Sequence, residues 1–146
     1  MKPYETPDNI AYSKILVPTI DTKKYTYLLN LMLKNKFPCM FVGESGTAKS
    51  VIISNYLSSL PSDDFMKLNI NFSSRTTSRD LQANIEDNID KRSGRIFGPK
   101  ILGKQLIIFI DDLHMPKVDT YGTQQPIALL KFFVEKNYIY ERSGNL

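Results

Sequence analysis

The chain has 146 residues, of which 42% are hydrophobic and 23% are charged, a composition typical of one globular domain. Its net charge of +4 comes from scattered lysines and arginines, so we expect no direct nucleic-acid binding, and no segment approaches the ~20 apolar residues of a membrane span. A single cysteine excludes an internal disulfide and favours a reducing, intracellular setting, and a single histidine, His114, excludes histidine-based metal centres and catalytic triads.

The N-terminal part of the chain predicts a lead-in, a helix and a strand. Residues 1–14 are polar with two prolines and are expected to be extended, and a short apolar element follows at Ile15–Thr19. Asp21 is expected to cap a helix that runs to about Lys36. Its apolar face would be formed by Tyr25, Leu28, Leu29 and Met32. The apolar run Cys39–Val42 predicts a buried strand, with Cys39 as a small core residue.

Strands and helices are predicted to alternate through the middle of the chain. A helix from about Lys49 to Ser59 stops before a proline, and its apolar face comprises Ile53, Leu57 and Leu60. Met66–Phe72 alternates apolar and polar residues, which is typical of a strand near a sheet edge. Thr77 and Ser78 are expected to cap a helix to about Ile89, with one stripe at Leu81, Ile85 and Ile89.

The C-terminal third predicts a hairpin-like excursion, a strand and a last helix. Turn-forming residues within Ile96–Lys104 favour the hairpin, and the unbroken apolar run Leu106–Ile110 suits a strand covered on both faces. Pro126 fits the first turn of the last helix, and Tyr138–Tyr140 could begin an extended segment. The inward-facing residues of that helix are expected to be Ile127, Leu130, Phe133 and Val134.

One loop carries the clearest chemistry in the sequence, because it follows the pattern G-x-x-x-x-G-K-[ST] at all but one fixed position. In such a loop, backbone N–H groups and the positive end of the next helix surround a triphosphate. Lys49 would neutralise the β- and γ-phosphates, and the Ser50 hydroxyl would coordinate Mg²⁺. The candidate nucleotide-binding residues are Gly43, Glu44, Ser45, Gly46, Thr47, Ala48, Lys49 and Ser50.

Ala48 is the departure from the pattern, since it replaces the last glycine. A methyl group is tolerated there if the residue keeps a negative φ, and we expect that it does. The simpler alternative is a Gly/Ser-rich turn with an exposed lysine.

A pair of carboxylates at Asp111 and Asp112 ends the apolar run near residue 110. A carboxylate at the C-terminal end of a buried parallel strand lies where ligands bind in open α/β sheets. Asp111 would hold Mg²⁺, directly or through water. Asp112 occupies the position where many P-loop ATPases carry a glutamate that orients the attacking water, and it is one methylene shorter. The alternative is ordinary turn chemistry after a strand.

Alternating strands and helices with a phosphate loop after the first strand predict an α/β P-loop NTPase fold. We expect a three-layer, right-handed arrangement, a parallel sheet with helices on both faces. The guanine-specifying motif N-K-x-D is absent, because Asn35-Lys36 is followed by Phe37-Pro38, which argues against a GTPase.

Several segments together resemble the motor of dynein heavy chains. They are Ile15–Thr22, the loop itself, Asn71–Thr77, Phe97–Pro99, Phe109–Asp119 and Tyr121–Leu130. The resemblance extends over about residues 15–142 and is closest to the third of the six AAA+ modules, of axonemal type. The chain is thereby identified as a partial AAA+ module from residue 15 to residue 146.

The resemblance implies a microtubule motor driven by Mg-ATP, located in the cytoskeleton and in the axoneme of a cilium or flagellum. It implies regulatory binding of ATP or ADP at this loop, with Asp112 as the catalytic residue and with Val17 and Pro18 lining the adenine. The implied partners are the neighbouring AAA+ modules of the same heavy chain, the intermediate and light chains, and microtubules through the whole motor.

The family's sheet order is 5-1-4-3-2, and this chain is expected to supply strands 1–3 only. Strand 1 would then lack both neighbours, and each buried unpaired backbone group costs ~1–3 kcal/mol. We therefore expect the isolated chain to be marginally stable and to hydrolyse ATP slowly or not at all. The alternatives are a nucleotide-binding scaffold without turnover and a fragment without independent function.

Overall fold

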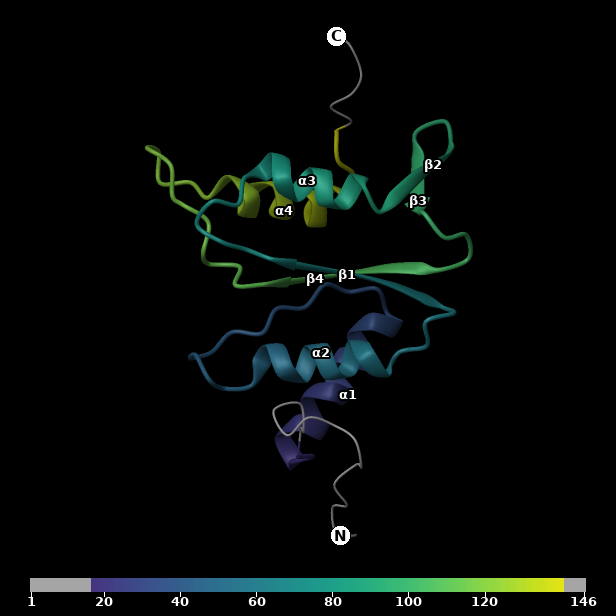
Figure 1. The fold of residues 1–146 in the computed structure, drawn as a ribbon, viewed down its shortest axis with the longest axis vertical. Coiled ribbons are helices and arrows are strands. Elements are labelled where there is room, and N and C mark those ends of the chain that lie inside the picture. Colours follow the sequence, from purple (N-terminus) through teal and green to yellow (C-terminus); the bar gives the residue numbers. More distant parts are fainter. Residues whose placement is uncertain (1–16, 141–146) are drawn as a thin grey trace. The chain divides into compact units, whose positions relative to one another are not determined.

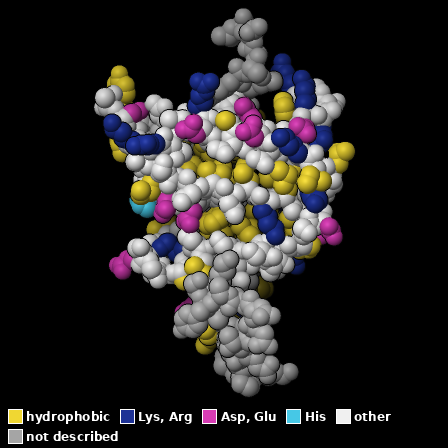
Figure 2. All heavy atoms as spheres, in the orientation of Figure 1, with side chains coloured by type: hydrophobic (Ala, Val, Ile, Leu, Met, Phe, Trp, Pro, Cys, Tyr) yellow, Lys and Arg dark blue, Asp and Glu magenta, His cyan; other side chains and the backbone are white. Residues whose placement is uncertain are grey.

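A computed structural model of the protein describes residues 17–140, and the predicted lead-in at 1–14 lies outside this range. The chain divides into two compact units, residues 1–60 and residues 61–146. Figure 1 shows the helices and strands of both units. On the face in Figure 2, acidic and basic side chains are interspersed, as the scattered charges of the sequence indicate. Within the described range, no helix is long and apolar enough to cross a membrane.

The first unit contains helices α1 (Ile20–Lys34) and α2 (Lys49–Ser59). Thr19, not Asp21 as predicted, is the N-cap of α1, and it forms a capping box with Thr22. The Thr19 hydroxyl accepts a hydrogen bond from the Thr22 N–H at 3.2 Å, and the Thr22 hydroxyl accepts one from the Thr19 N–H at 2.8 Å. This reciprocal pair satisfies two backbone N–H donors at the helix start. Asp21 lies in the first turn instead, where its negative charge interacts favourably with the positive end of the helix.

Helix α1 ends two residues before the predicted limit, in a left-handed turn at Lys36 with φ of 57°. The Phe37 N–H donates to the Met32 carbonyl at 3.0 Å and the Lys36 N–H to the Leu33 carbonyl at 3.1 Å. These two bonds are those of a Schellman motif, which satisfies the last carbonyls of a helix.

The predicted strand at Cys39–Val42 is wrong for this structure, because residues 37–44 have no regular secondary structure. A strand needs a hydrogen-bonded neighbour, and no described segment pairs with this one. Cys39 is exposed, contrary to its predicted core position, and Val42 is 82% exposed. Phe41 alone makes an aromatic contact, edge-to-face with Tyr25 at 5.6 Å between ring centroids.

Helix α2 has the predicted bounds, and it packs on α1. Leu60 is extended at φ −73° and ψ 141°, the conformation favoured before the proline that follows it. The Tyr56 hydroxyl donates to Asn30 Oδ1 across the two helices at 3.3 Å. The buried residues of the unit are Leu29, Ile52, Tyr56 and Leu57.

The second unit is built on two parallel strands, β1 (Phe65–Asn71) and β4 (Gln105–Asp111), which pair in register from Phe65 with Gln105 to Asn71 with Asp111. Both strands were predicted, and the family's sheet order 5-1-4-3-2 implies that they are neighbours. The expected wider sheet is reduced to this pair within the described residues. Its buried core comprises Ile70, Phe72, Leu81 and Ile85. Figure 1 shows α3 (Ser78–Glu86) and α4 (Gln125–Lys136) on the same face of the pair.

Helix α3 begins where predicted, with Thr77 as N-cap in a capping box with Asp80, but it ends at Glu86 rather than near Ile89. Ile89 instead opens strand β2 (Ile89–Ser93), which pairs antiparallel with β3 (Ile96–Pro99). A hairpin therefore exists, but it spans Ile89–Pro99, and only Ile96–Pro99 of the predicted segment Ile96–Lys104 is a strand. Leu81, which is 0% exposed, anchors α3 in the core.

Helix α4 carries Pro126 in its first turn, as predicted. Val134 was expected to face inward and is 50% exposed, whereas Leu129 and Leu130 pack against the core. After the helix, the Tyr140 carbonyl accepts a hydrogen bond of 2.7 Å from the buried Gln82 side chain. This bond holds the end of the described chain against α3. Tyr138–Tyr140 forms no strand in this structure.

Candidate functional site

The candidate phosphate loop, Gly43–Ser50, leads directly into α2. Gly46 has a φ of +81°, which favours glycine, and Ala48 has a φ of +59°, which contradicts the expected negative value. Ala48 is also the N-cap of α2. The left-handed conformation at residue 48 is therefore a property of the backbone path, and the alanine adopts it despite its Cβ.

The N-terminus of α2 differs from those of α1 and α3. Threonine side chains cap the other two helices, whereas α2 has no side-chain cap hydrogen bond. The Ile52 N–H makes the first helical bond, to the Ala48 carbonyl at 3.0 Å. The positive end of α2 is thus not covered by a capping side chain, as an anion site at a helix N-terminus requires.

Lys49 lies over the loop, and its ammonium group bonds to the loop's own oxygens. It donates to the Gly43 carbonyl at 2.8 Å, to the Glu44 carbonyl at 2.5 Å and to Thr47 Oγ1 at 3.1 Å. Thr47 in turn donates to the Glu44 carbonyl at 2.8 Å. A Cβ added at Gly43 would lie 3.5 Å from Thr47 Oγ1 and 3.8 Å from Lys49 Cδ, so the lysine stem packs closely over this glycine.

The carboxylate pair lies in the second unit, at the C-terminal end of β4. Asp111 is half-buried, and its Oδ1 accepts the Asp112 N–H at 3.0 Å. The Asp111 carbonyl accepts the Phe72 N–H at 3.0 Å, which extends the ladder by one bond. Asp112 is exposed and left-handed, with φ of 53°, and its carbonyl accepts the Met115 N–H at 3.0 Å. Both carboxylates are therefore at the predicted strand end.

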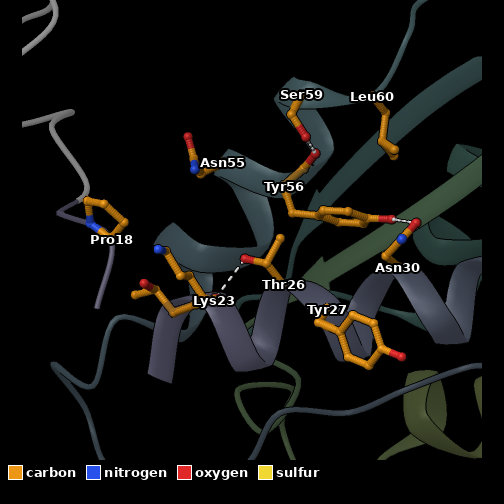
Figure 3. Close-up of a pocket in the computed structure, with 10 residues that line it drawn as sticks. Pro18, Lys23, Thr26, Tyr27, Asn30, Asn55, Tyr56, Ser59 and Leu60 are labelled. Atoms are coloured by element: carbon orange, nitrogen blue, oxygen red, sulfur yellow. Dashed lines mark hydrogen bonds between the residues drawn. The ribbon is translucent and has the colours of Figure 1, made fainter. Parts of the chain in front are cut away.

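The resemblance implies that Val17 and Pro18 line adenine. Pro18 lines a cavity of about 540 Å³, whereas Val17 does not line it and is 54% exposed. Figure 3 shows this cavity, with Pro18 at one side and residues of α1 and α2 around it. No residue of the Gly43–Ser50 loop lines it. Its lining residues are Pro18, Thr22, Lys23, Thr26, Tyr27, Asn30, Asn55, Tyr56, Ser59 and Leu60.

Two side chains that no sequence pattern predicted, Gln124 and Asp119, hydrogen-bond the chain after the carboxylate pair. The Gln124 side-chain amide donates to the His114 carbonyl at 2.9 Å and to the Pro116 carbonyl at 2.7 Å. Asp119 Oδ1 accepts the Tyr121 N–H at 2.9 Å and the Thr123 N–H at 2.8 Å. The hydrogen bond from Thr123 is the main cause that lowers the pKa of Asp119. The sequence signal that could have predicted these bonds is an aspartate in a turn, since such a side chain accepts hydrogen bonds from N–H groups a few residues further along.

A glycine loop that opens a helix, a lysine over that loop and carboxylates at the end of a parallel strand are the parts of a P-loop nucleotide-binding module. The sequence matches the family described as the P-loop containing dynein motor region, over residues 4–146. The chain therefore belongs to the dynein heavy chain motor family.

Individual relatives agree with this assignment. The chain is 56% identical over 146 residues to the dynein-1-alpha heavy chain of the flagellar inner arm I1 complex of Chlamydomonas reinhardtii. It is 50% identical over 135 residues to dynein axonemal heavy chain 10 and 38% identical over 142 residues to dynein axonemal heavy chain 2, both of Homo sapiens. The matches cover 100%, 92% and 97% of this chain, and 3% of each relative.

Proposed function

We propose that this chain binds ATP or ADP through the Gly43–Ser50 loop, as one nucleotide site of an axonemal dynein heavy chain. The loop geometry carries the proposal, because Gly46 and Ala48 turn the backbone into the N-terminus of a helix without a side-chain cap. The Lys49 ammonium is already held over that loop by three oxygens. A bound triphosphate would offer stronger, anionic acceptors, so we expect Lys49 to move from the loop carbonyls to the β- and γ-phosphates.

Ser50 and Asp111 fit the chemistry of a Mg²⁺ site, since the ion prefers hydroxyl and carboxylate oxygens. Among residues 17–140, no group of three or more His, Cys, Asp or Glu could hold a metal by itself. An ion here would therefore take its other ligands from phosphate and water, as nucleotide-bound Mg²⁺ does. Asp112 is the residue proposed to orient a water molecule.

We further propose that the site corresponds to the third AAA+ module and is regulatory, while another module supplies most of the hydrolysis for movement. The partners would be the neighbouring modules, the intermediate and light chains and, through the whole motor, microtubules in a cilium or flagellum. The relatives, which are named as axonemal or flagellar dynein heavy chains, support this setting.

The test is the number of nucleotides retained by a heavy chain that contains this sequence. Lys49→Ala should lower the nucleotide released on denaturation by about one per heavy chain, because the lysine contacts the phosphates. The matched control is Lys34→Ala, an exposed lysine in the last turn of α1, which should leave that number unchanged. An unchanged number for Lys49→Ala would contradict nucleotide binding at this loop. In microtubule gliding, a regulatory site predicts slower movement by the Lys49→Ala motor with residual ATPase activity.

A further inference from the structure

A second cavity, of about 460 Å³, lies wholly within residues 61–140. It is formed where the loop after β1 meets the loop after β4, and Figure 1 shows both loops leaving the strand pair at the same end. Its volume is within the range of small-molecule sites, roughly 300–1,000 Å³. Neither Asp111 nor Asp112 lines it. The lining residues are Ser74, Arg75, Thr76, Thr77, Lys117, Val118, Asp119, Thr120, Gln125 and Pro126.

The side chains of this cavity supply more hydrogen-bond donors than acceptors. Within residues 17–140, the Arg75 guanidinium and the Lys117 ammonium have no acidic partner. The hydroxyls of Ser74 and Thr120 likewise make no hydrogen bond with described residues. One cation comes from the first loop and one from the second, so the two loops present positive charge to the same space.

Asp119, the one acidic residue of the lining, is already engaged. Its carboxylate accepts two backbone N–H groups of its own loop, from Tyr121 and Thr123. These bonds hold it ionised within its turn rather than against Arg75 or Lys117. Two cations and one carboxylate give the lining a formal charge of +1. Thr77 is also committed, because its hydroxyl donates to Asp80 Oδ2 at 2.8 Å.

We propose that this cavity is an anion site for a small phosphate-bearing molecule, separate from the Gly43–Ser50 loop. A phosphate group offers several acceptor oxygens and matches the planar fork of arginine, while lysine contributes a point charge. The hydroxyls of Ser74 and Thr120 provide two further donors. The site depends on neither Lys49 nor Asp111, so it does not rest on the proposed nucleotide site.

The experiment measures the rate at which an amine-reactive reagent labels Lys117 in the intact heavy chain, by peptide mass spectrometry. Pyrophosphate is the probe, compared with sodium chloride at equal ionic strength. With a dissociation constant on the order of 1 mM, about 2 mM pyrophosphate leaves a third of the sites free, so labelling should slow about threefold. Lys131, an exposed residue of α4 that does not line the cavity, is the internal reference.

Two variants assign the effect to this cavity. Arg75→Gln should abolish the protection of Lys117, whereas Arg79→Gln, an exposed arginine of α3 outside the cavity, should preserve it. Equal labelling with pyrophosphate and chloride, equal protection of Lys131, or equal behaviour of the two variants would overturn the proposal. If Lys117 were unreactive in both pyrophosphate and chloride, the proposal would also be overturned, because the cavity would then be filled by an acidic protein segment. Labelling of Lys49 in the same samples reports the phosphate loop independently.

Discussion

Ala48→Gly tests whether the left-handed conformation at the entry of α2 is strained. A non-glycine residue in this conformation costs roughly 1–2 kcal/mol, and Ala48 has φ of 59° and ψ of 19°. Glycine removes that cost, but it also gives the unfolded chain about 0.4–1 kcal/mol of additional conformational freedom. The net expectation is that the N-terminus of α2 becomes more stable by about 0.5–1 kcal/mol.

Hydrogen–deuterium exchange in the intact heavy chain measures this change locally. The Ile52 N–H bonds to the Ala48 carbonyl at 3.0 Å, so it exchanges when the first turn of α2 opens. A gain of 0.5–1 kcal/mol corresponds to exchange about two- to fivefold slower at this amide. The measurement concerns one helix end and does not require the whole heavy chain to unfold in a single step.

Ala83→Gly is the matched control, since Ala83 is an exposed residue inside α3. Glycine in a helix interior costs roughly 0.5–1 kcal/mol, so exchange in α3 should become faster there. The same substitution is thus expected to have opposite signs at the two positions. Faster exchange of Ile52 in Ala48→Gly would refute the claim that residue 48 is strained.

Three further changes test the fold of the isolated chain. Thr19→Ala removes the capping box of α1 and should lower the free energy of unfolding by about 1 kcal/mol, measured by urea denaturation, whereas Thr19→Ser should retain most of it. Leu81→Ala opens a cavity at a fully buried position and should cost about 2–5 kcal/mol, enough to remove the cooperative thermal transition of a marginal chain; an unchanged transition would contradict the core assignment. Because the folded pKa of Asp119 is lowered, chiefly by the Thr123 N–H, its stabilisation is present above its unfolded pKa of about 4 and is lost as the pH falls through the lower folded value. Asp119→Asn keeps a hydrogen-bond acceptor that does not titrate. Acid unfolding of this variant, followed by circular dichroism, should therefore depend less steeply on pH in this range than unfolding of the unchanged chain.

The sequence predicted the elements whose signals are local. The bounds of α2 follow from helical spacing before Pro61, and β4 follows from five consecutive apolar residues before Asp111. In both cases the side chains of the element itself determine the outcome. The pairing of β1 with β4 was expected for another reason, because strands 2 and 3 are neighbours in the family's sheet order.

The errors occurred where the outcome depends on distant groups or on backbone angles. The run Cys39–Val42 has the composition of a strand, but pairing depends on a neighbour that its own residues do not encode. The end of α3 was misplaced because Ile89 satisfies a helical stripe and a strand equally well, and pairing with Pro99 selects the strand. The left-handed angle at Ala48 could not be read from a residue type that rarely adopts it.

Four non-glycine residues of the described chain have positive φ, and they divide into two kinds. Lys36 and Asn137 end helices, where a left-handed residue satisfies the last carbonyls. Ala48 and Asp112 end no helix. One precedes Lys49 in the first unit and the other follows Asp111 in the second, so each of these left-handed residues adjoins a candidate site residue in the sequence. Strained backbone of this kind persists where the surrounding structure over-determines it, often at functional sites.

Asp112→Glu tests the role of the second carboxylate under this constraint. If Asp112 orients water in the proposed site, the added methylene extends its reach by about 1.5 Å, and a misplacement near 1 Å can cost on the order of 10²-fold in rate. We therefore expect faster ATP hydrolysis by the Asp112→Glu form. Glutamate tolerates the left-handed conformation less well than aspartate, so amide exchange should also become faster around Met115, whose N–H bonds to the residue 112 carbonyl. The assay is single-turnover ATP hydrolysis by the intact heavy chain. Measuring it with and without Lys49→Ala isolates the contribution of the Gly43–Ser50 loop. Asp112→Asn is the matched control, since it keeps the turn and removes the charge, and it should lower that contribution. Equal hydrolysis by the Asp, Glu and Asn forms would show that residue 112 only terminates the strand, and the site would then bind nucleotide without turning it over.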